Sequence, residues 1–133
     1  MVDGAFDPLH VGHIEYLKAA ADLGCPLFCN VASDRYVGAK HPPLLPAEQR
    51  AAILDAIRYV AYTHVNELDT ETVLKQLKPR YYVKGSDWKG SLPSRQIEIC
   101  CSHGIEVVYL DTVRDSSSRI LERFIDRTRN QVP

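Results

Sequence analysis

The sequence has no excess of either charge, no long apolar run and no CxxC cysteine motif. Its 133 residues carry 16 Lys and Arg against 17 Asp and Glu, a formal net charge of −1. Such a balance gives no general attraction for nucleic acid or a membrane surface, so local groups must hold any anionic ligand. A membrane-spanning helix needs a run of about 18 apolar residues, and no stretch of this sequence approaches that length. The first residues also lack the charged-then-apolar order of a secretory signal. We therefore expect no nucleic-acid partner, no membrane partner and a cytoplasmic location.

The four cysteines do not form a recognisable disulfide framework. They are Cys25, Cys29, Cys100 and Cys101, and a bridge between two adjacent cysteines is geometrically awkward. This usage favours a reducing compartment with buried or half-buried thiols. A zinc site that combines Cys25 or Cys29 with a histidine stays open, and with it a zinc-stabilised interaction domain.

Apolar runs alternate along the chain with helical periods, and the length suits one domain. Helical patterns cover 13–24, 46–60, 69–79, 94–104 and 116–130, and strand patterns cover 26–33, 60–65, 80–85 and 105–110. We expect Asp69 or Thr70, Gly104 and one of the serines from 116 to cap these helices. The rhythm predicts an α/β fold: one Rossmann-like domain over 1–133, with a parallel sheet of about five strands and helices on both faces.

Two segments depart from this rhythm. Residues 34–46 form a long irregular stretch, which in a compact domain is often a lid or binding loop. The first strand has only Met1 to Asp3 available before Gly4, although the first strand of a doubly wound sheet is normally central. A central strand of three residues would leave its neighbours poorly paired. We therefore expect that the first strand is truncated, by a clipped N-terminus or a start codon assigned too late, and that the native N-terminus extends upstream of Met1.

The segment "GAFDPLHVGH", residues 4–13, lies between that strand and the first helix. In an open α/β sheet this is where ligands bind, at the carboxyl ends of the strands. Gly4 permits a tight exit from the strand, and Gly12 lets a ligand approach the backbone closely. Free N–H groups at the helix start favour an anion, and His10 and His13 add donors of tunable charge. The segment indicates a polyphosphate site without a P-loop, although a His-x-x-His pair can also be half a metal site or an accident of composition.

Four segments together resemble a known family. "GAFDPLHVGH" looks like the HxGH signature of the nucleotidyltransferase superfamily that includes cytidylyltransferases and heptose-phosphate adenylyltransferases. "YVKGSDW" (82–88) resembles the strand-end motif of these enzymes, and "RDSSSRIL" (114–121) resembles their serine/threonine-rich helix start. "PAEQR" (46–50) matches a less specific stretch. The resemblance covers nearly the whole chain in the same order.

The resemblance implies a reaction and a set of site residues. An acceptor phosphate attacks the α-phosphorus of a nucleoside triphosphate and pyrophosphate leaves, so catalysis depends on positioning and charge stabilisation. His10 and His13 would donate to the phosphates in the transition state, with Lys84 as a third catalytic residue. The implied nucleotide-binding residues are Gly4, Ala5, Phe6, Asp7, Gly12, Gly85, Asp87, Trp88, Ser116, Ser117 and Ser118. The implied acceptor-binding residues are Lys40, Arg50 and Arg114.

Several of these residues have simpler interpretations that the sequence leaves open. The serines from 116 to 118 can cap a helix and hold phosphates at once, because a helix N-terminus does both. Lys84 can be a solvated lysine, and Trp88 can be a core aromatic residue. Arg50 can pair with a carboxylate of its own helix. His41, His64 and His103 have no motif around them, and we expect them in loops or at the surface.

We therefore predict a nucleotidyltransferase that transfers CMP or AMP from CTP or ATP to a phosphorylated small metabolite, a sugar or polyol phosphate. Mg²⁺ is expected to bind with the triphosphate, and no protein-built metal site is expected. The resemblance also implies a homodimer. One alternative is an adenylyltransferase of a cofactor precursor, of flavin or coenzyme A type. Another is a catalytically silent nucleotide-binding module.

Overall fold

The structure, a computed structural model, describes residues 1–111 and 116–131. Strands and helices alternate through this range, as the hydrophobic pattern predicts. The strands are β1 (Val2–Gly4), β2 (Phe28–Ala32), β3 (Tyr62–Asn66), β4 (Tyr81–Gly85) and β5 (Glu106–Leu110). The helices are α1 (Val11–Ala21), α2 (Asp34–Gly38), α3 (Ala47–Asp55), α4 (Thr70–Leu77), α5 (Ser94–His103) and α6 (Ser117–Arg129), with the 3-10 turn η1 (Ser86–Trp88) after β4.

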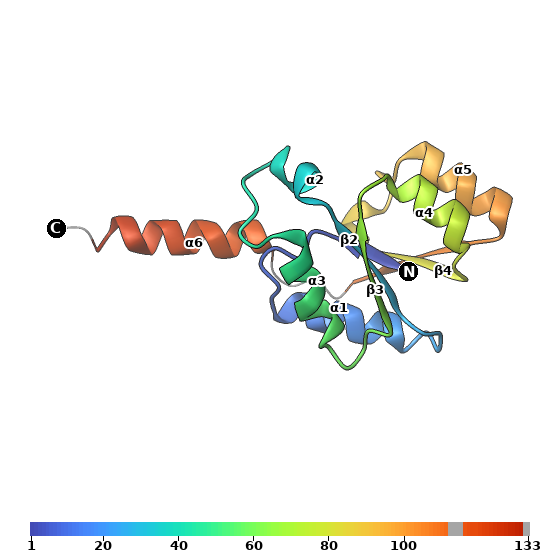
Figure 1. Cartoon of the computed structure of the whole chain (residues 1–133), viewed down its shortest axis with the longest axis horizontal. Coiled ribbons are helices and arrows are strands. Elements are labelled where there is room, and N and C mark those ends of the chain that lie inside the picture. Colours follow the sequence, from blue (N-terminus) through green and yellow to red (C-terminus); the bar gives the residue numbers. More distant parts are fainter. Residues whose placement is uncertain (112–115, 132–133) are drawn as a thin grey trace.

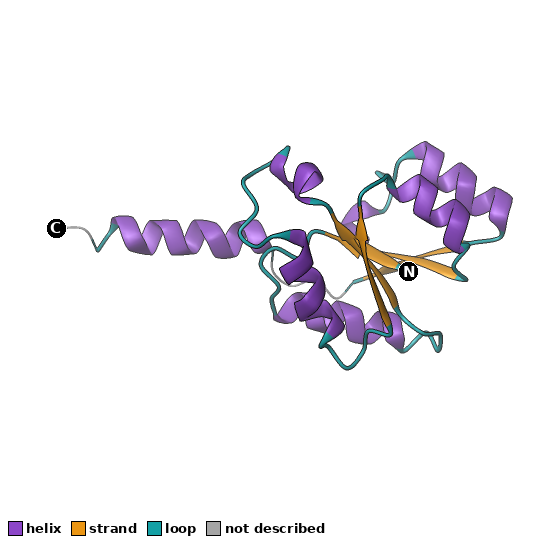
Figure 2. Cartoon of the chain, viewed as in Figure 1, coloured by secondary structure: helices purple, strands orange, loops and turns teal. Residues whose placement is uncertain are grey.

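The five strands form one parallel sheet in the order β3-β2-β1-β4-β5. Helices α1 and α3 lie on one face of the sheet, and α4 and α5 lie on the other (Figures 1 and 2). The chain changes its direction of travel across the sheet between β1 and β4, which is the point where open α/β sheets bind their ligands. The predicted α/β fold is confirmed.

The first strand is central although it has three residues. Asp3 and Gly4 pair with Asn30 and Val31 of β2, and Val2 pairs with Val83 of β4. The amino group of Met1 extends the second pairing, since it donates to the carbonyl of Tyr81 at 2.7 Å. Three residues and the amino group of Met1 are thus enough to pair β1 with both of its neighbours.

A separate apolar core lies on each face of the sheet. Successive strand residues point to opposite faces, so the neighbours Tyr82 and Val83 belong to different cores. Leu17 of α1 and Leu54 of α3 pack with Val83, whereas Leu74 of α4 packs with Tyr82. Burial of these side chains holds the helices against the sheet and keeps the carboxyl ends of the strands in place.

The predicted caps are observed. Asp69 caps α4, where its carboxylate accepts a hydrogen bond from the N–H of Thr72 at 2.6 Å. Gly104 ends α5 in the left-handed region, at a φ of 67°. Ser116 caps α6 through a hydrogen bond from the N–H of Arg119 at 3.2 Å.

Several predicted boundaries differ from those of the structure, most of all around α3. The helix expected over 46–60 ends at Asp55, and β3 begins at Tyr62 rather than at residue 60. The side chains of Ile57 and Val60 pack against the core from outside the helix, so they prolong the apolar pattern without prolonging the helix. The segment expected to be irregular over 34–46 begins with the short helix α2.

The last helix differs from the others in its surroundings. None of the residues of α6 is buried, and the helix projects away from the sheet (Figure 1). Phe124 is 67% exposed and Ile125 is 46% exposed. No helix within the described ranges is long and apolar enough to cross a membrane.

Candidate active site

The two histidines of the HxGH motif cap helix α1 with their own rings. Nδ1 of His10 accepts a hydrogen bond from the N–H of Gly12 at 3.1 Å, and Nδ1 of His13 accepts one from the N–H of His10 at 3.3 Å. This is a reciprocal capping arrangement, built from histidines instead of the usual serine and glutamate. The spacing of the motif follows from it, because the second ring must lie at the third residue of the helix.

These hydrogen bonds select the tautomer of each neutral ring. Since both Nδ1 atoms accept, each neutral ring carries its proton on Nε2 and is a donor there. The rings are stacked, with centroids 3.8 Å apart and planes inclined by 28°. Burial, and secondarily the neighbouring His10, lower the pKa of His13 to about 4. His13 is therefore a neutral hydrogen-bond donor at pH 7.

Gly4 and Phe6 hold the start of the motif. Phe6 has a positive φ of 52°, and its ring meets the ring of His13 edge-on at 5.1 Å. A Cβ atom on Gly4 would lie 3.2 Å from the ring of Phe6. A side chain at position 4 would thus press on the ring of Phe6, which gives a packing reason for the glycine at the strand exit.

The serine run reaches the HxGH motif through one hydrogen bond. The hydroxyl of Ser117 donates to the carbonyl of Pro8 at 2.9 Å. This contact places the N-terminus of α6 beside the start of α1, and Ser118 is exposed in the first turn of α6. Helix N-termini carry partial positive charge and unpaired N–H groups, so two of them here favour an anion.

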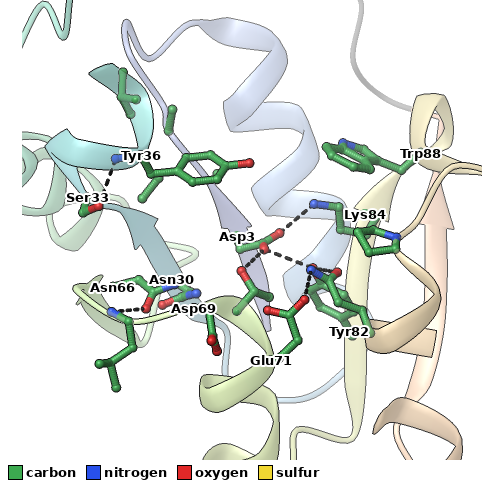
Figure 3. Close-up of a pocket in the computed structure, with 18 of the residues that line it drawn as sticks. Asp3, Asn30, Ser33, Tyr36, Asn66, Asp69, Glu71, Tyr82, Lys84 and Trp88 are labelled. Atoms are coloured by element: carbon green, nitrogen blue, oxygen red, sulfur yellow. Dashed lines mark hydrogen bonds and ion pairs between the residues drawn. The ribbon is translucent and has the colours of Figure 1, made fainter. Parts of the chain in front are cut away.

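A cavity of about 460 Å³ opens on the other side of β1 (Figure 3). Its volume lies within the range of small-molecule sites. Its walls come from the carboxyl ends of β1 to β4, from α2, from the start of α4 and from α5. The lining residues include Asp3, Gly4, Ala5, Asn30, Tyr36, Lys40, Asn66, Glu71, Tyr82, Lys84, Trp88 and Gln96.

Asp3 and Lys84 form an ion pair at the centre of this cavity. Nζ of Lys84 lies 2.7 Å from a carboxylate oxygen of Asp3, and the two side chains are only 9% and 14% exposed. The other oxygen of Asp3 accepts from the hydroxyls of Tyr82 at 3.0 Å and Thr70 at 3.2 Å. Lys84 also lies 4.2 Å from the ring centroid of Trp88, a cation–π contact. Lys84 therefore lies at the crevice rather than in bulk solvent.

The phenol of Tyr82 keeps its proton in this network. Burial, followed by the nearby Asp3 carboxylate, raises the pKa of Tyr82 far above its ordinary value. The hydroxyl donates to Asp3, as any phenol beside a carboxylate does.

Arg50, for which the resemblance implies an acceptor-binding role, does not line the cavity. Its guanidinium is fully buried and pairs with Asp34 at 2.7 Å. It also donates to the carbonyls of Ala5, Ala32 and Leu45 at 2.8 to 2.9 Å. Arg50 thus uses four of its five N–H groups in hydrogen bonds, and these bonds join the HxGH loop, β2 and the 34–46 segment.

Asp7 also has a structural task that the sequence did not indicate. Its carboxylate, 1% exposed, accepts from the N–H groups of Leu44 at 2.7 Å and Leu45 at 3.2 Å. These bonds tie the 34–46 segment to the HxGH motif.

The remaining expected site residues divide into three groups. Lys40 lines the cavity, and its Nζ lies 5.9 Å from the ring centroid of Tyr36. Gly85 is buried at the end of β4 and Asp87 is exposed on η1. Arg114 lies outside the described residues.

Sequence reasoning missed the polar wall of the cavity. Asn30 lies within the buried strand β2, Asn66 ends β3, and Gln96 donates to Glu71 at 3.4 Å. One sequence feature could have indicated this wall: Asn30 is a polar residue within the apolar run of β2, and buried polar groups need a partner.

The cysteines and histidines do not gather elsewhere. Cys25, Cys29, Cys100 and Cys101 are free thiols. In the described part of the chain, no group of three or more His, Cys, Asp or Glu could hold a metal ion.

Comparisons with known proteins agree with this geometry. Residues 1–123 match the family model described as cytidylyltransferase-like. An FAD synthase of Thermococcus kodakarensis is 36% identical over 137 residues, which covers 95% of this chain and 91% of that protein. The bifunctional protein HldE of Syntrophotalea carbinolica is 35% identical over 130 residues, and the match covers 94% of this chain but only 26% of HldE.

A solved structure has the same fold. The lipopolysaccharide core biosynthesis protein of Thermoplasma volcanium superposes with a TM-score of 0.73 at 26% identity, covering 84% of this chain and 94% of that one. The HxGH cap, the serine-capped helix beside it and the family match over 1–123 lead to one conclusion: this chain belongs to the cytidylyltransferase-like family and is a nucleotidyltransferase.

Proposed function

We propose that this chain transfers AMP from ATP to the phosphate of flavin mononucleotide (FMN), forming FAD and pyrophosphate. One observation carries the proposal: the histidine cap of α1 and the 460 Å³ cavity lie on opposite sides of the end of β1. A triphosphate on the histidine side and an acceptor in the cavity would then meet at Gly4 and Ala5. The similarity over nearly full length to an FAD synthase supports adenine as the base and a flavin as the acceptor.

The reaction needs no strong base. An anionic oxygen of the acceptor phosphate attacks the α-phosphorus of ATP, one P–O bond forms, and the bond to the departing pyrophosphate breaks. The rate then depends on alignment and on donors that stabilise the crowded, negatively charged phosphorus centre. His10 and His13 would supply Nε2–H donors, and Gly12 would allow the α-phosphate to approach the start of α1.

The N-terminus of α6 would hold the outgoing phosphates. Ser116, Ser117 and Ser118 offer hydroxyl and N–H groups there, next to the carbonyl of Pro8. Phe6 would maintain His13 in position, while Gly85 and Asp87 would contact the nucleotide from the end of β4. Trp88 would lie at the border between nucleotide and acceptor, because it lines the cavity and covers Lys84.

Two lysines would neutralise the acceptor phosphate. Lys84 is held at the cavity centre by Asp3, and Lys40 lies at its rim. As the phosphate enters, Lys84 would contact both the carboxylate and the phosphate, since an ammonium group has three donors. In this arrangement Lys84 would be a catalytic residue and Lys40 a binding residue.

Mg²⁺ would arrive with the triphosphate. It commonly binds through substrate phosphates and one or two carboxylates and keeps several waters. Beside the motif, the carboxylates of Asp3 and Asp7 already bind Lys84 and loop N–H groups. Phosphate oxygens would therefore be its main ligands, and the ion would neutralise charge on the leaving group.

We also propose a homodimer, a cytoplasmic location and a single domain over 1–133. The exposed apolar side chains of Phe124 and Ile125 on the projecting helix α6 support a second copy as the surface that covers them. The four free thiols fit a reducing compartment.

A second candidate is transfer of AMP or CMP to a sugar or polyol phosphate. The similarity to HldE and the Lys84 segment "VKGSDW" favour it. Its acceptor would fill the same cavity.

The test measures pyrophosphate release with ATP or CTP in combination with FMN, glycerol 3-phosphate or a sugar 1-phosphate. The proposal expects release with ATP and FMN, and a product with the mass of FAD. Release with a sugar or polyol phosphate alone would overturn the flavin assignment in favour of the second candidate. Tight ATP binding without release in any combination would indicate a silent nucleotide-binding module.

A further inference from the structure

The cavity has two chemically different sides (Figure 3). The Asp3–Lys84 ion pair lies near the middle, with Trp88 beside Lys84 on one side and Asn30, Asn66 and Asp69 on the other. A phosphate suits the side with Lys84. The far side offers amide and carboxylate groups, which pair with neutral N–H or O–H donors and repel a second phosphate.

Asn30 is the most unusual residue of the far side. It is 1% exposed, and its Oδ1 has no hydrogen-bond partner among residues 1–111 and 116–131. Buried polar atoms are nearly always paired, so one that faces a cavity indicates an absent partner. The parallel register places Asn30 beside Asp3, but the donors around Asp3 are already used by its carboxylate.

Two aromatic side chains, Tyr36 and Trp88, line the cavity from opposite sides. Tyr36 of α2 is 60% exposed, and its ring extends into the cavity from the side opposite Trp88 (Figure 3). Lys40 approaches the ring of Tyr36, and Lys84 approaches that of Trp88. Trp88 is half-buried and still lines the cavity. Aromatic rings on both sides of a cavity suit a planar ring, which stacks on such surfaces.

We infer that a planar heteroaromatic acceptor ring binds between Tyr36 and Trp88, and that the amide of Asn30 hydrogen-bonds its –CO–NH– edge. This inference rests on the proposed function, since the flavin ring carries such an imide edge at N3. An amide side chain and an imide edge each have one donor and one acceptor side by side, so they can pair twice. Tyr36 and Asn30 thus determine which acceptor is used, without contact with the transferred phosphorus.

The test compares wild type with Tyr36→Leu and Asn30→Leu, with Tyr62→Leu as the matched control. Tyr62 is 62% exposed on β3 and does not line this cavity. KM for FMN and KM for ATP are measured separately, and FMN fluorescence is titrated with each protein. FMN and N3-methyl-FMN are both assayed, because the methyl group removes the N3–H donor.

For Tyr36→Leu we expect KM for FMN to rise about 3- to 10-fold, with less quenching of flavin fluorescence and KM for ATP within twofold. For Asn30→Leu we expect kcat/KM for FMN to fall about 10- to 100-fold. The wild type should discriminate against N3-methyl-FMN, and Asn30→Leu should not. Tyr62→Leu should behave as the wild type.

Equal use of FMN and N3-methyl-FMN by the wild type would overturn the role of Asn30, even if Asn30→Leu fails to fold. An equal rise of both KM values in Tyr36→Leu would overturn the stacking role. In either case FAD formation by the wild type would leave the proposed function standing. A wild type that forms no FAD from ATP and FMN would overturn both.

Discussion

The hydroxyl of Ser117 donates a hydrogen bond to the carbonyl of Pro8 at 2.9 Å, across 109 positions of the sequence. This bond joins the serine run to the HxGH motif, and it places the N-terminus of α6 beside the histidine cap of α1. Residues from the two ends of the described chain thus lie together at the proposed phosphate site.

Ser117→Ala removes this bond and one hydroxyl from the proposed phosphate site. We expect KM for ATP to rise about 3- to 10-fold, with KM for the acceptor nearly unchanged. Ser102→Ala is the matched control, because the hydroxyl of Ser102 bonds to the carbonyl of Ile99 within α5. A variant that unfolds at lower temperature but keeps the wild-type KM for ATP would contradict the phosphate role.

His13→Ala removes a proposed transition-state donor. We expect kcat to fall about 10²- to 10³-fold, the usual loss for one such donor, with the melting temperature lowered by a few degrees at most. His64→Ala, at an exposed position on β3, serves as the control. A large loss of melting temperature together with a small loss of kcat would identify His13 as a structural histidine.

The lowered pKa of His13 makes the stability of the free protein depend on pH. The folded state resists protonation until about pH 4, whereas an unfolded histidine is protonated below about 6.5. The stabilisation is therefore complete above pH 6.5 and is lost as the pH falls towards 4. Between pH 7.5 and 4.5 we expect this group to cost about 2 to 3 kcal/mol of unfolding free energy.

The measurement is urea unfolding of wild type and His13→Gln at both pH values. Other groups titrate in this range, so the difference between the two proteins isolates His13. Wild type should lose more free energy on acidification than His13→Gln. The same loss in both would mean that His13 has an ordinary pKa.

The alternation of strands and helices was predictable because it depends on local periodicity. Asp69, Gly104 and Ser116 cap their helices through hydrogen bonds to residues no more than four positions away. The end of α3 was not predictable, because Ile57 and Val60 continue the apolar pattern of the helix beyond its last residue. Both side chains pack against the core from the loop that follows the helix. Local patterns give the elements, and tertiary packing decides where they stop.

The candidate site was predictable where residues act near one another in sequence. The roles of Arg50 and Asn30 were not. The partners of Arg50 come from the HxGH loop, β2 and the 34–46 segment, and only the folded chain brings them together. In the sequence, Asn30 is a single polar residue within a strand pattern. Its role could not be predicted because only the folded chain forms the cavity beside it.

Lys84→Met tests the ion pair at the cavity centre. It leaves the carboxylate of Asp3 buried without its cation, and breaking such a pair typically costs about 3 to 5 kcal/mol. The double variant Asp3→Asn, Lys84→Met removes both charges and should regain most of that stability. Both variants should be inactive, because the acceptor phosphate loses its cation in both. Recovery of activity in the double variant would contradict a catalytic Lys84.

Phe124→Glu tests the proposed dimer surface. Placing a charge in an apolar contact should raise the dimer dissociation constant about 30-fold or more, which sedimentation equilibrium detects. Ile97→Glu on α5, where Ile97 is 43% exposed, is the matched control. A wild type that stays monomeric at high concentration, or a Phe124→Glu variant that stays dimeric, would contradict α6 as the interface.

The most direct test of the central claim is phosphorus NMR of ATP and FMN incubated with Mg²⁺ and the wild-type chain. Attack at the α-phosphorus predicts pyrophosphate and the diphosphate signals of FAD, appearing together in equal amounts and lost in His13→Ala. ADP with a phosphorylated FMN that carries a new phosphoanhydride, or ADP with orthophosphate, would show attack at the γ-phosphorus and would contradict the account.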